Sequence, residues 1–301
     1  METKNKSITK KTVTAALSLT LAFGAVASLG ACKQEAAEFD ENKNISVVVR
    51  EDGSGTKSAF MELLGLKGKA DVSGAIVATG TTAVLQEVKG NSFAIAYDSL
   101  GFVTDEVKKL KVDGVAPTVD NIKSGSYKIS RPLNVVYQAE NVASGVNAAF
   151  LSYLQSAQAQ TIISAKGYVS TKDNAVQYVA DTSLEGEINI SGSTSLKPLM
   201  EFLAEEFETL QQNVTVNVAG GGSGTGYNDG NTGVSDFGMI SEVFNESKAS
   251  NCTYYQVAKD GIAVIINKSN PLDSISLADL KNIFDVDAGD NAIKTWAKIS
   301  K

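Results

Sequence analysis

Residues 47–60 read VVVREDGSGTKSAF, and this stretch decides the architecture because it joins a strand, a turn and a helix start. The β-branched residues predict a strand that ends at Arg50, and the apolar residues after the turn have helical spacing. A glycine-rich turn before a helix presents free backbone N–H groups and the positive end of the helix dipole. Ser54 and Thr56 add hydroxyl donors, and Arg50 adds a planar pair of N–H donors. The stretch favours a site for a tetrahedral oxyanion, with a capped helix beside a surface arginine as the simpler alternative.

Two other turns of this chain have the same glycine and hydroxyl composition. VAGGGSGTGYNDG spans 218–230, and ISGSTSLKPL spans 190–199 directly before an amphipathic helix. Ser223 is the expected donor of the first turn, and Thr194 and Ser195 are the expected donors of the second. Taken alone, the glycine run is equally typical of a flexible loop. Because the same kind of turn occurs repeatedly, we expect one ligand that is held from several sides.

An acidic residue in VSDFGMIS, residues 234–241, has a different expected role. Among hydrogen-bond donors, the carboxylate of Asp236 would accept a proton that the ligand carries. The alternative is an aspartate that caps a turn.

The rest of the chain alternates short apolar runs with amphipathic helices, which indicates α/β architecture with largely parallel sheets. A polar, weakly patterned segment at 169–187 divides the chain roughly in half, and at least its second part is interpreted as a connector. The helix at 197–210 is expected to turn Phe202 inward with its leucines. Strands are expected at 45–49, 93–97, 214–220 and 261–267, and a strand with its following loop at 186–195. Helices are expected at 57–66, 81–88, 144–165, 197–210 and 277–284.

Length and composition exclude several classes of function. A chain of 301 residues is long enough for two lobes, and its formal net charge of −7 argues against a nucleic-acid-binding protein. The sequence has no histidine. This absence removes Ser-His-Asp and Cys-His catalysis and histidine-based zinc sites. We therefore expect no catalytic residues, no metal and no cofactor.

The N-terminus has the order of an export signal: a basic head, an apolar stretch and small residues. Residues 29–32 read LGAC and resemble a bacterial lipobox, so Cys32 is the expected lipidation site after removal of the signal peptide 1–31. A plain secretory signal or a transmembrane anchor is the alternative. Residues 32–44 are polar and are expected to form a flexible tether. Cys252 would then have no disulfide partner in the mature chain and is expected to be buried.

Together these segments resemble the PstS family, the phosphate-binding proteins of bacterial phosphate ABC transporters. The resemblance rests on GSTS followed by proline, GGGSG, DFG and REDGSGT, and on the regions IAYDSLG and 112–133; it covers nearly all of 45–300. It implies a two-lobed, type II periplasmic-binding-protein fold with the ligand cleft between the lobes. The ligand residues that it implies are Arg50, Ser54, Gly55, Thr56, Thr194, Ser195, Ser223 and Asp236.

The resemblance also implies a function. The expected ligand is inorganic phosphate, and the expected partner is the membrane permease of an ABC importer. A monomeric lipoprotein outside the cytoplasmic membrane, without enzymatic activity, is expected. If Asp236 accepts the proton of phosphate, sulfate would bind about 10³-fold more weakly. A protein that binds or senses another tetrahedral oxyanion, or a secreted phosphatase, is the alternative.

The segments do not follow the family's order. In the family GSTS, GGGSG and DFG come first, whereas here the half with REDGSGT opens the chain. This order predicts a circular permutant in which 45–128 and 256–301 form one lobe and 129–255 the other. Half-sites shared between two chains, or a truncated C-terminus, are the alternatives. Relatives also commonly have Ser-Arg after DFG, where this chain reads MISEVF. The resemblance therefore does not assign the residues of the pocket rim after Gly238.

Overall fold

The computed structural model describes residues 38–300, and the statements below concern these residues. The predicted signal peptide, Cys32 and the first part of the predicted tether lie outside them. Within residues 38–300, one mixed sheet has the strand order β2-β1-β3-β11-β6-β10-β8-β9, with β4 and β7 also paired to β11. Its strands are β1 (Ser46–Arg50), β2 (Ile76–Ala78), β3 (Ala94–Ser99), β4 (Lys108–Lys109), β6 (Ser130–Tyr137), β7 (Val169–Ser170), β8 (Gly186–Gly192), β9 (Val214–Gly220), β10 (Phe237–Ile240) and β11 (Thr253–Ile266).

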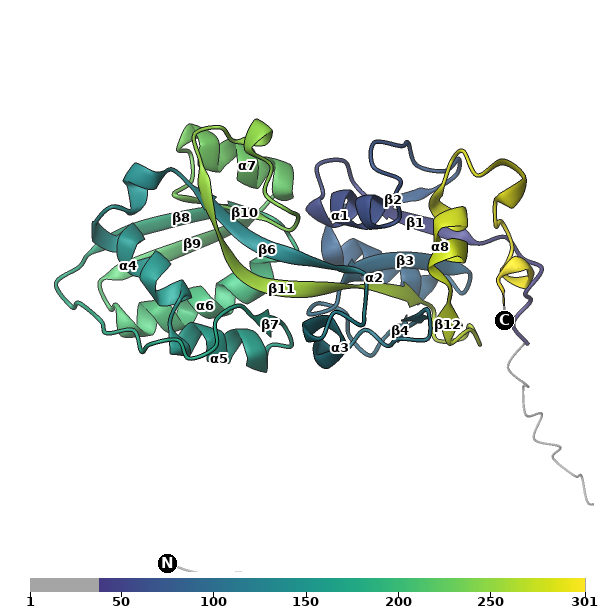
Figure 1. Cartoon of the computed structure of the whole chain (residues 1–301), viewed down its shortest axis with the longest axis horizontal. Helices are drawn as coiled ribbons and strands as arrows, with labels where there is room; N and C mark the ends of the chain where they lie inside the picture. The colour runs from purple at the N-terminus through teal and green to yellow at the C-terminus, as the bar shows by residue number, and fades with distance from the viewer. Residues whose placement is uncertain (1–37, 301) are drawn as a thin grey trace, which may run out of the picture. The chain divides into compact units, whose positions relative to one another are not determined.

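The helices flank this sheet (Figure 1). They are α1 (Gly55–Leu63), α2 (Gly80–Gly90), α3 (Val119–Lys123), α4 (Gly145–Leu154), α5 (Ala157–Ala165), α6 (Lys197–Leu210), α7 (Ser223–Thr232) and α8 (Leu277–Phe284). Short 3₁₀ turns lie at Ala139–Val142, Glu246–Lys248, Gly289–Asn291 and Trp296–Lys298. Strands β5 (Lys111–Val112) and β12 (Ser274–Ile275) pair with each other in a small separate sheet.

Strands β6 and β11 connect two lobes. Their antiparallel pairing extends from Thr253–Tyr137 to Gly261–Ser130, and the following half of β11 pairs with β3. Each lobe has its own hydrophobic core. The β1 lobe is built around residues such as Phe60, Tyr97, Phe284 and Trp296, and the β8 lobe around residues such as Phe150, Leu203, Phe207 and Phe237. The predicted two-lobed α/β fold is confirmed.

The sheet is more mixed than the sequence predicts. β1 is parallel to β2 and β3, and β8 is parallel to β9 and β10. β11, however, is antiparallel to β3 and β6, and β6 is antiparallel to β10. The parallel groups thus lie within the lobes, and the antiparallel strands lie where the chain passes between them.

The two ends of the described chain lie side by side in the β1 lobe, where the purple and yellow segments of Figure 1 meet. The N–H of Ile45 donates to the carbonyl oxygen of Lys294 at 2.8 Å, and Asn44 forms a β-bridge with Thr295. The ring of Phe39 lies 5.8 Å from that of Trp296. Residues 39–44, which the sequence places in a flexible tether, are therefore packed against the lobe.

The helix expected over 144–165 is broken into α4 and α5. The hydroxyl of Ser156 accepts a hydrogen bond from the N–H of Ala159 at 3.3 Å and caps α5, so a new helix begins there. The prediction for Phe202 is also wrong. Its side chain is 42% exposed, and the ammonium group of Lys166 lies 3.2 Å from the ring centroid. A cation over the ring lets this aromatic side chain remain at the surface.

Candidate functional site

The candidate site lies where strands of both lobes end. β1 ends at Arg50, and α1 begins after Ser54, whose hydroxyl accepts the N–H of Lys57 at 3.3 Å. In the β8 lobe, β8 ends at Gly192 and β10 at Ile240. The carboxyl ends of parallel strands form one edge of a sheet, and ligands of α/β proteins bind at such edges. The turns that follow these strands therefore bring their donors to one place.

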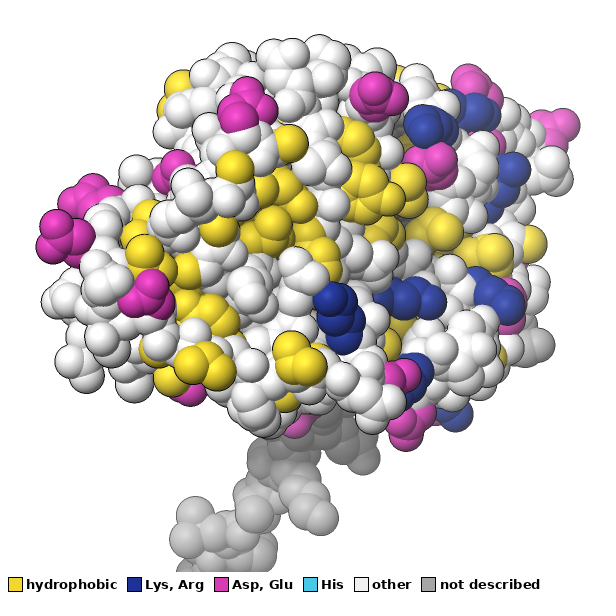
Figure 2. Space-filling model, turned by 60° about the vertical axis from the view of Figure 1, so that its left-hand side comes forward, with side chains coloured by type: hydrophobic (Ala, Val, Ile, Leu, Met, Phe, Trp, Pro, Cys, Tyr) yellow, Lys and Arg dark blue, Asp and Glu magenta, His cyan; other side chains and the backbone are white. Residues whose placement is uncertain are grey.

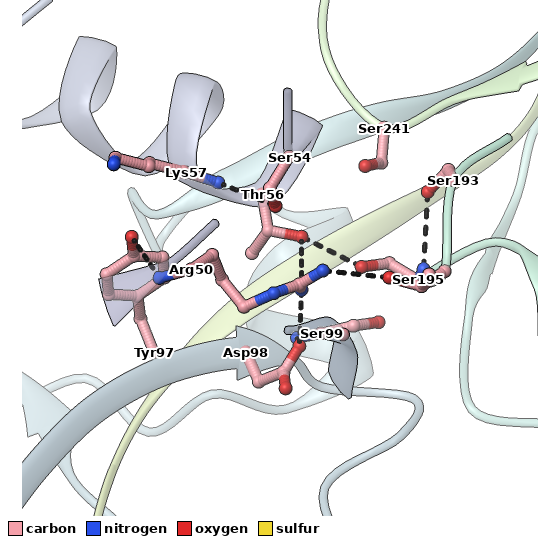
Figure 3. A network of polar contacts seen from close by, with 12 residues as sticks. Arg50, Ser54, Thr56, Lys57, Tyr97, Asp98, Ser99, Ser193, Ser195 and Ser241 are labelled. Atoms are coloured by element: carbon pink, nitrogen blue, oxygen red, sulfur yellow. Dashed lines mark hydrogen bonds and ion pairs between the residues drawn. The ribbon is translucent and has the colours of Figure 1, made fainter. Parts of the chain in front are cut away.

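Arg50 lies at the centre of this place and is 1% exposed. Its Nη2 donates to Oγ1 of Thr194 at 2.8 Å, across the lobe boundary, and its Nη1 donates to Oγ1 of Thr56 at 3.3 Å. Nε and Nη2 also donate to the carboxylate of Glu51 at 2.9 and 3.0 Å. Figure 3 shows the guanidinium between Thr56 and Asp98, whose Oδ1 is 3.6 Å from Nη1. One arginine thus connects both lobes.

The pKa values of Arg50 and Glu51 shift in opposite directions. Burial works against the charged guanidinium, but its hydrogen bonds to Glu51 and the negative charge of Asp98 raise the pKa of Arg50 overall. Burial also opposes ionisation of Glu51, yet its hydrogen bonds with Arg50 lower the pKa of Glu51. Both groups therefore remain charged near neutral pH.

Serine and threonine hydroxyls surround the arginine. Oγ1 of Thr56 and Oγ of Ser195 lie 2.8 Å apart and join the two lobes. Oγ of Ser223 lies 3.3 Å from Oγ of Ser241 and accepts the N–H of Ser241 at 3.0 Å. Oγ of Ser193 accepts the N–H of Ser195 at 3.2 Å. Several neutral donors thus meet around one cation.

Gly55 is required by the close approach of the lobes. A Cβ at Gly55 would lie 2.2 Å from Oγ of Ser223 and 2.7 Å from Oγ of Ser241, which is too close for any side chain. The first turn of α1 can therefore meet the β8 lobe only through a glycine. Nearby, the N–H of Gly224 donates to the carbonyl oxygen of Gly53 at 3.0 Å.

The structure brings seven of the eight predicted ligand residues into one cluster: Arg50, Ser54, Gly55, Thr56, Thr194, Ser195 and Ser223. It adds Ser193 and Ser241, which the sequence interpretation did not select. Both follow directly on the end of a strand, β8 or β10, and that position is the signal that could have identified them.

Asp236 is not brought to this cluster. It precedes β10, whereas Ser241 follows it, and four strand residues place the two about 13 Å or more apart. Its Oδ1 accepts the side-chain N–H of Asn147 at 2.9 Å, and its Oδ2 accepts the N–H of Asn189 at 2.8 Å. The structure therefore gives Asp236 the alternative role, that of an aspartate that holds a turn.

Two other carboxylates are buried near the cluster. Asp98 is fully buried, and burial, the largest influence, raises its pKa to about 6. Asp260 accepts the hydroxyl of Ser99 at 2.7 Å and a guanidinium N–H of Arg131 at 3.3 Å. Arg131 also donates to the carbonyl oxygen of Ser241 at 3.1 Å, so this ion pair reaches the site from β6 and β11.

A cavity of about 600 Å³ lies beside the cluster. Gly53, Ser54 and Gly224 line it, whereas Arg50 and Thr56 are nearly fully buried. The four lysines on its wall are all paired with carboxylates: Lys57 with Asp52 and Asp71, Lys67 with Glu62, Lys69 with Asp285 and Asp287, and Lys248 with Glu242. The turns thus connect the buried cluster to an accessible cleft, and each lysine that lines this cleft is already paired with a carboxylate.

Two features are absent from residues 38–300. No group of three or more His, Cys, Asp and Glu side chains in this range is placed to hold a metal ion. No helix in the same range has both the length and the apolarity needed to cross a membrane. Cys252 is free and half-buried, and burial raises the pKa of its thiol.

Known proteins resemble this chain in sequence and in fold. The family model of the PBP superfamily domain matches residues 2–158 and 174–298. Phosphate-binding protein PstS 2 of Streptococcus pneumoniae is 33% identical over 292 residues, which cover 93% of this chain and 98% of that protein. Phosphate-binding protein PstS of Bacillus subtilis is 32% identical over only 134 residues, 43% of each chain.

A solved structure agrees with the first of these relatives. The phosphate-binding protein of a phosphate ABC transporter from S. pneumoniae superimposes with a TM-score of 0.69 at 33% identity, over 85% of this chain and all of that one. The family model, the sequence similarity over nearly the whole length and the structural similarity all point to one family. The chain belongs to the PBP superfamily and, within it, to the PstS family of phosphate-binding proteins.

Proposed function

We propose that this protein captures inorganic phosphate between its lobes and delivers it to the permease of an ABC importer. The observation that carries the proposal is the hydrogen bonding of Arg50 to hydroxyls of both lobes, Thr56 and Thr194. A guanidinium with several hydroxyl and backbone donors suits a tetrahedral oxyanion. The names of the relatives support phosphate as that oxyanion.

Local donors attract the anion, because the charge of the whole protein does not. The formal net charge is −7, and removal of residues 1–31 would change it to −10 because they contain four lysines and one glutamate. On the face shown in Figure 2, basic side chains occur singly or in small groups beside acidic ones. Long-range steering therefore contributes little to capture, and affinity comes from the cluster around Arg50.

We further propose that the mature protein is a monomer anchored outside the cytoplasmic membrane through a lipid on Cys32, and that it has no enzymatic activity. The export-type N-terminus supports the anchor. The contact between Thr56 and Ser195 supports a monomer, because one chain supplies both halves of the cluster. A pocket made of half-sites from two chains is therefore not needed to bring these residues together.

Calorimetric titration with phosphate, arsenate and sulfate tests the proposed ligand. We expect phosphate and arsenate to bind more tightly than sulfate, with one site per chain. Tighter binding of sulfate would identify a protein for another oxyanion. Release of phosphate from a phosphate ester, in proportion to protein added, would instead support the phosphatase alternative.

We also propose that the chain is a circular permutant, with 45–128 and 256–301 as one lobe and 129–255 as the other. The match to the pneumococcal relative extends over nearly the whole length of both chains, which supports the same order of segments in that protein as in this chain. The match to the B. subtilis relative covers 43% of each chain, as expected where only one half aligns in order. The neighbouring chain ends and the largely exposed connector at 170–186 also support the proposal.

Re-cutting the protein tests the permutation. The new termini would lie in the exposed segment 181–183, and a short glycine linker would join the old C-terminus to Phe39. The old ends are close, because the N–H of Ala297 donates to the carbonyl oxygen of Glu41 at 2.7 Å. We expect a monomer that binds phosphate as tightly as the parent. Misfolding of the re-cut protein would contradict the proposal, and a parent that light scattering shows to be an obligate dimer would contradict the monomer.

A further inference from the structure

Two carboxylates flank Arg50. Glu51 accepts two guanidinium N–H groups, and Asp98, in β3, lies 3.6 Å from Nη1. The exposed fraction of the side chain is 21% for Glu51 and 0% for Asp98. The single positive charge of Arg50 therefore faces two negative charges in a shielded environment.

The next buried cation does not change this balance. Arg131 is ion-paired with Asp260 at 3.3 Å, and both side chains are 1% exposed. Three buried or half-buried carboxylates thus face two guanidinium groups around the cluster. An anion that binds to Arg50 enters a region that already has more negative than positive charge. Like-charge repulsion favours protonation of the carboxylate that is least stabilised.

Asp98 is that carboxylate. Its Oδ1 accepts the N–H of Ser99 at 2.8 Å, and its Oδ2 has no hydrogen-bond partner within residues 38–300. Glu51, by comparison, accepts the N–H of Gly80 at 3.1 Å in addition to its two bonds with Arg50. A buried carboxylate oxygen without a donor is costly to keep charged.

We propose that Asp98 takes up a proton from solvent when the anion binds, and that Asp98 is thereby a positioning residue that leaves the charge of Arg50 to the ligand. The O–H bond forms on the Asp98 carboxyl group, which becomes neutral. No other bond changes. The inference rests on the proposed binding of phosphate.

Charged groups and tyrosines face Asp98 from the neighbouring elements. Arg50 in β1 and Arg131 in β6 lower its pKa, and Asp260 in β11 raises it, but burial dominates. Burial raises the pKa values of the Tyr97 and Tyr168 hydroxyls far above neutrality. Burial raises the pKa of Asp260 as well, and its Oδ1 likewise has no partner within residues 38–300. Its Oδ2, however, accepts from both Ser99 and Arg131, whereas Asp98 has only the N–H of Ser99 and is the carboxylate beside Arg50.

The sign of the effect follows from linkage. The neutral form of Asp98 binds the anion better, so affinity is highest below its pKa and falls as the pH rises above it. Bound anion raises that pKa further, so binding at pH 8 should be accompanied by proton uptake. In Asp98→Asn the side chain is neutral at every pH, so this part of the pH dependence should disappear.

Calorimetry of the parent and of Asp98→Asn with phosphate, from pH 5 to 8 in buffers of different ionisation heat, tests the inference. Phosphate itself titrates, but its titration cancels in the ratio of the two affinities. We expect the variant to bind about 50- to 100-fold more tightly than the parent at pH 8, two pH units above the Asp98 pKa of about 6, and about equally at pH 5. Asp105→Asn removes a fully exposed carboxylate of the same lobe and should leave the ratio at one throughout.

Three results would overturn the inference. One is an affinity ratio that does not change with pH, and another is weaker binding by Asp98→Asn at every pH. If the variant does not fold, the parent decides: equal apparent binding heats in all buffers at pH 8 would show that no proton is taken up. A parent that binds no phosphate at any pH is a different result, because it refutes the proposed function itself.

Discussion

Gly55→Ala tests whether the two lobes meet at the predicted place. The added methyl group would lie 2.2 Å from Oγ of Ser223 and 2.7 Å from Oγ of Ser241, which both belong to the β8 lobe. Gly55 itself is the first residue of α1, in the β1 lobe. The clash therefore opposes the contact between the lobes and leaves the core of each lobe unchanged.

The magnitude follows from the cost of overpacking. An inserted methyl group costs about 1–3 kcal/mol when its neighbours must move. Because the Cβ of Ser223 would also be within 2.9 Å, rotation of its hydroxyl does not remove the clash. If ligand binding requires the lobes in contact, this cost appears in binding, as a loss of about 5- to 150-fold in phosphate affinity.

Calorimetry and thermal unfolding in parallel distinguish the two places where the cost could appear. We expect Gly55→Ala to weaken phosphate binding while the Tm without phosphate changes little. Gly90→Ala is the matched control, because Gly90 ends α2 in the same lobe and a Cβ there meets nothing within 4 Å. Unchanged phosphate affinity in Gly55→Ala would refute the reasoning, and so would an equal loss in Gly90→Ala.

Two further substitutions test individual side chains. Arg50→Lys keeps the charge but cannot reproduce the bonds to Thr56, Thr194 and Glu51 together, so we expect a loss of about 1–3 kcal/mol in phosphate binding by calorimetry. If the variant binds phosphate as tightly as the parent, Arg50 does not contact the ligand. Asp236→Asn places an amide N–H against the N–H of Asn189 or Asn147, so we expect a loss of about 1–2 kcal/mol in the free energy of unfolding, measured with denaturant. The selectivity for phosphate over sulfate should be unchanged, and a fall in selectivity would return Asp236 to its predicted role.

The sequence predicted most of the cluster because each donor lies in a strand-turn-helix unit. In such a unit the turn always comes at the carboxyl end of a strand, so Arg50, Thr56 and Ser195 could be assigned to one edge of a sheet. The same rule explains the error at Asp236. It lies before β10 and therefore at the opposite end, whereas Ser241 lies after it. No strand was predicted at 237–240, so the sequence did not indicate at which end of β10 Asp236 lies.

Other features depend on contacts that no local pattern reveals. Asp98 lies in a fully buried strand, and its proximity to Arg50 follows from the pairing of β1 with β3, which joins Val47 to Ile95. The packing of residues 39–44 likewise depends on Trp296, at the far end of the chain. A polar segment of low periodicity looks like a tether when its partner is more than two hundred residues away.

The order of the two halves along the chain matters little to the site, because each turn is attached to its own strand. β1 has its neighbours β2 and β3 within the β1 lobe, and β8 has β9 and β10 within the β8 lobe. Hydrogen-bond register then fixes where each turn emerges, whichever half comes first. What the site does require is that β6 and β11 pair across the boundary, since this pairing sets Thr56 against Ser195. The two crossing strands, and not the chain order, are therefore the feature on which the donor cluster depends.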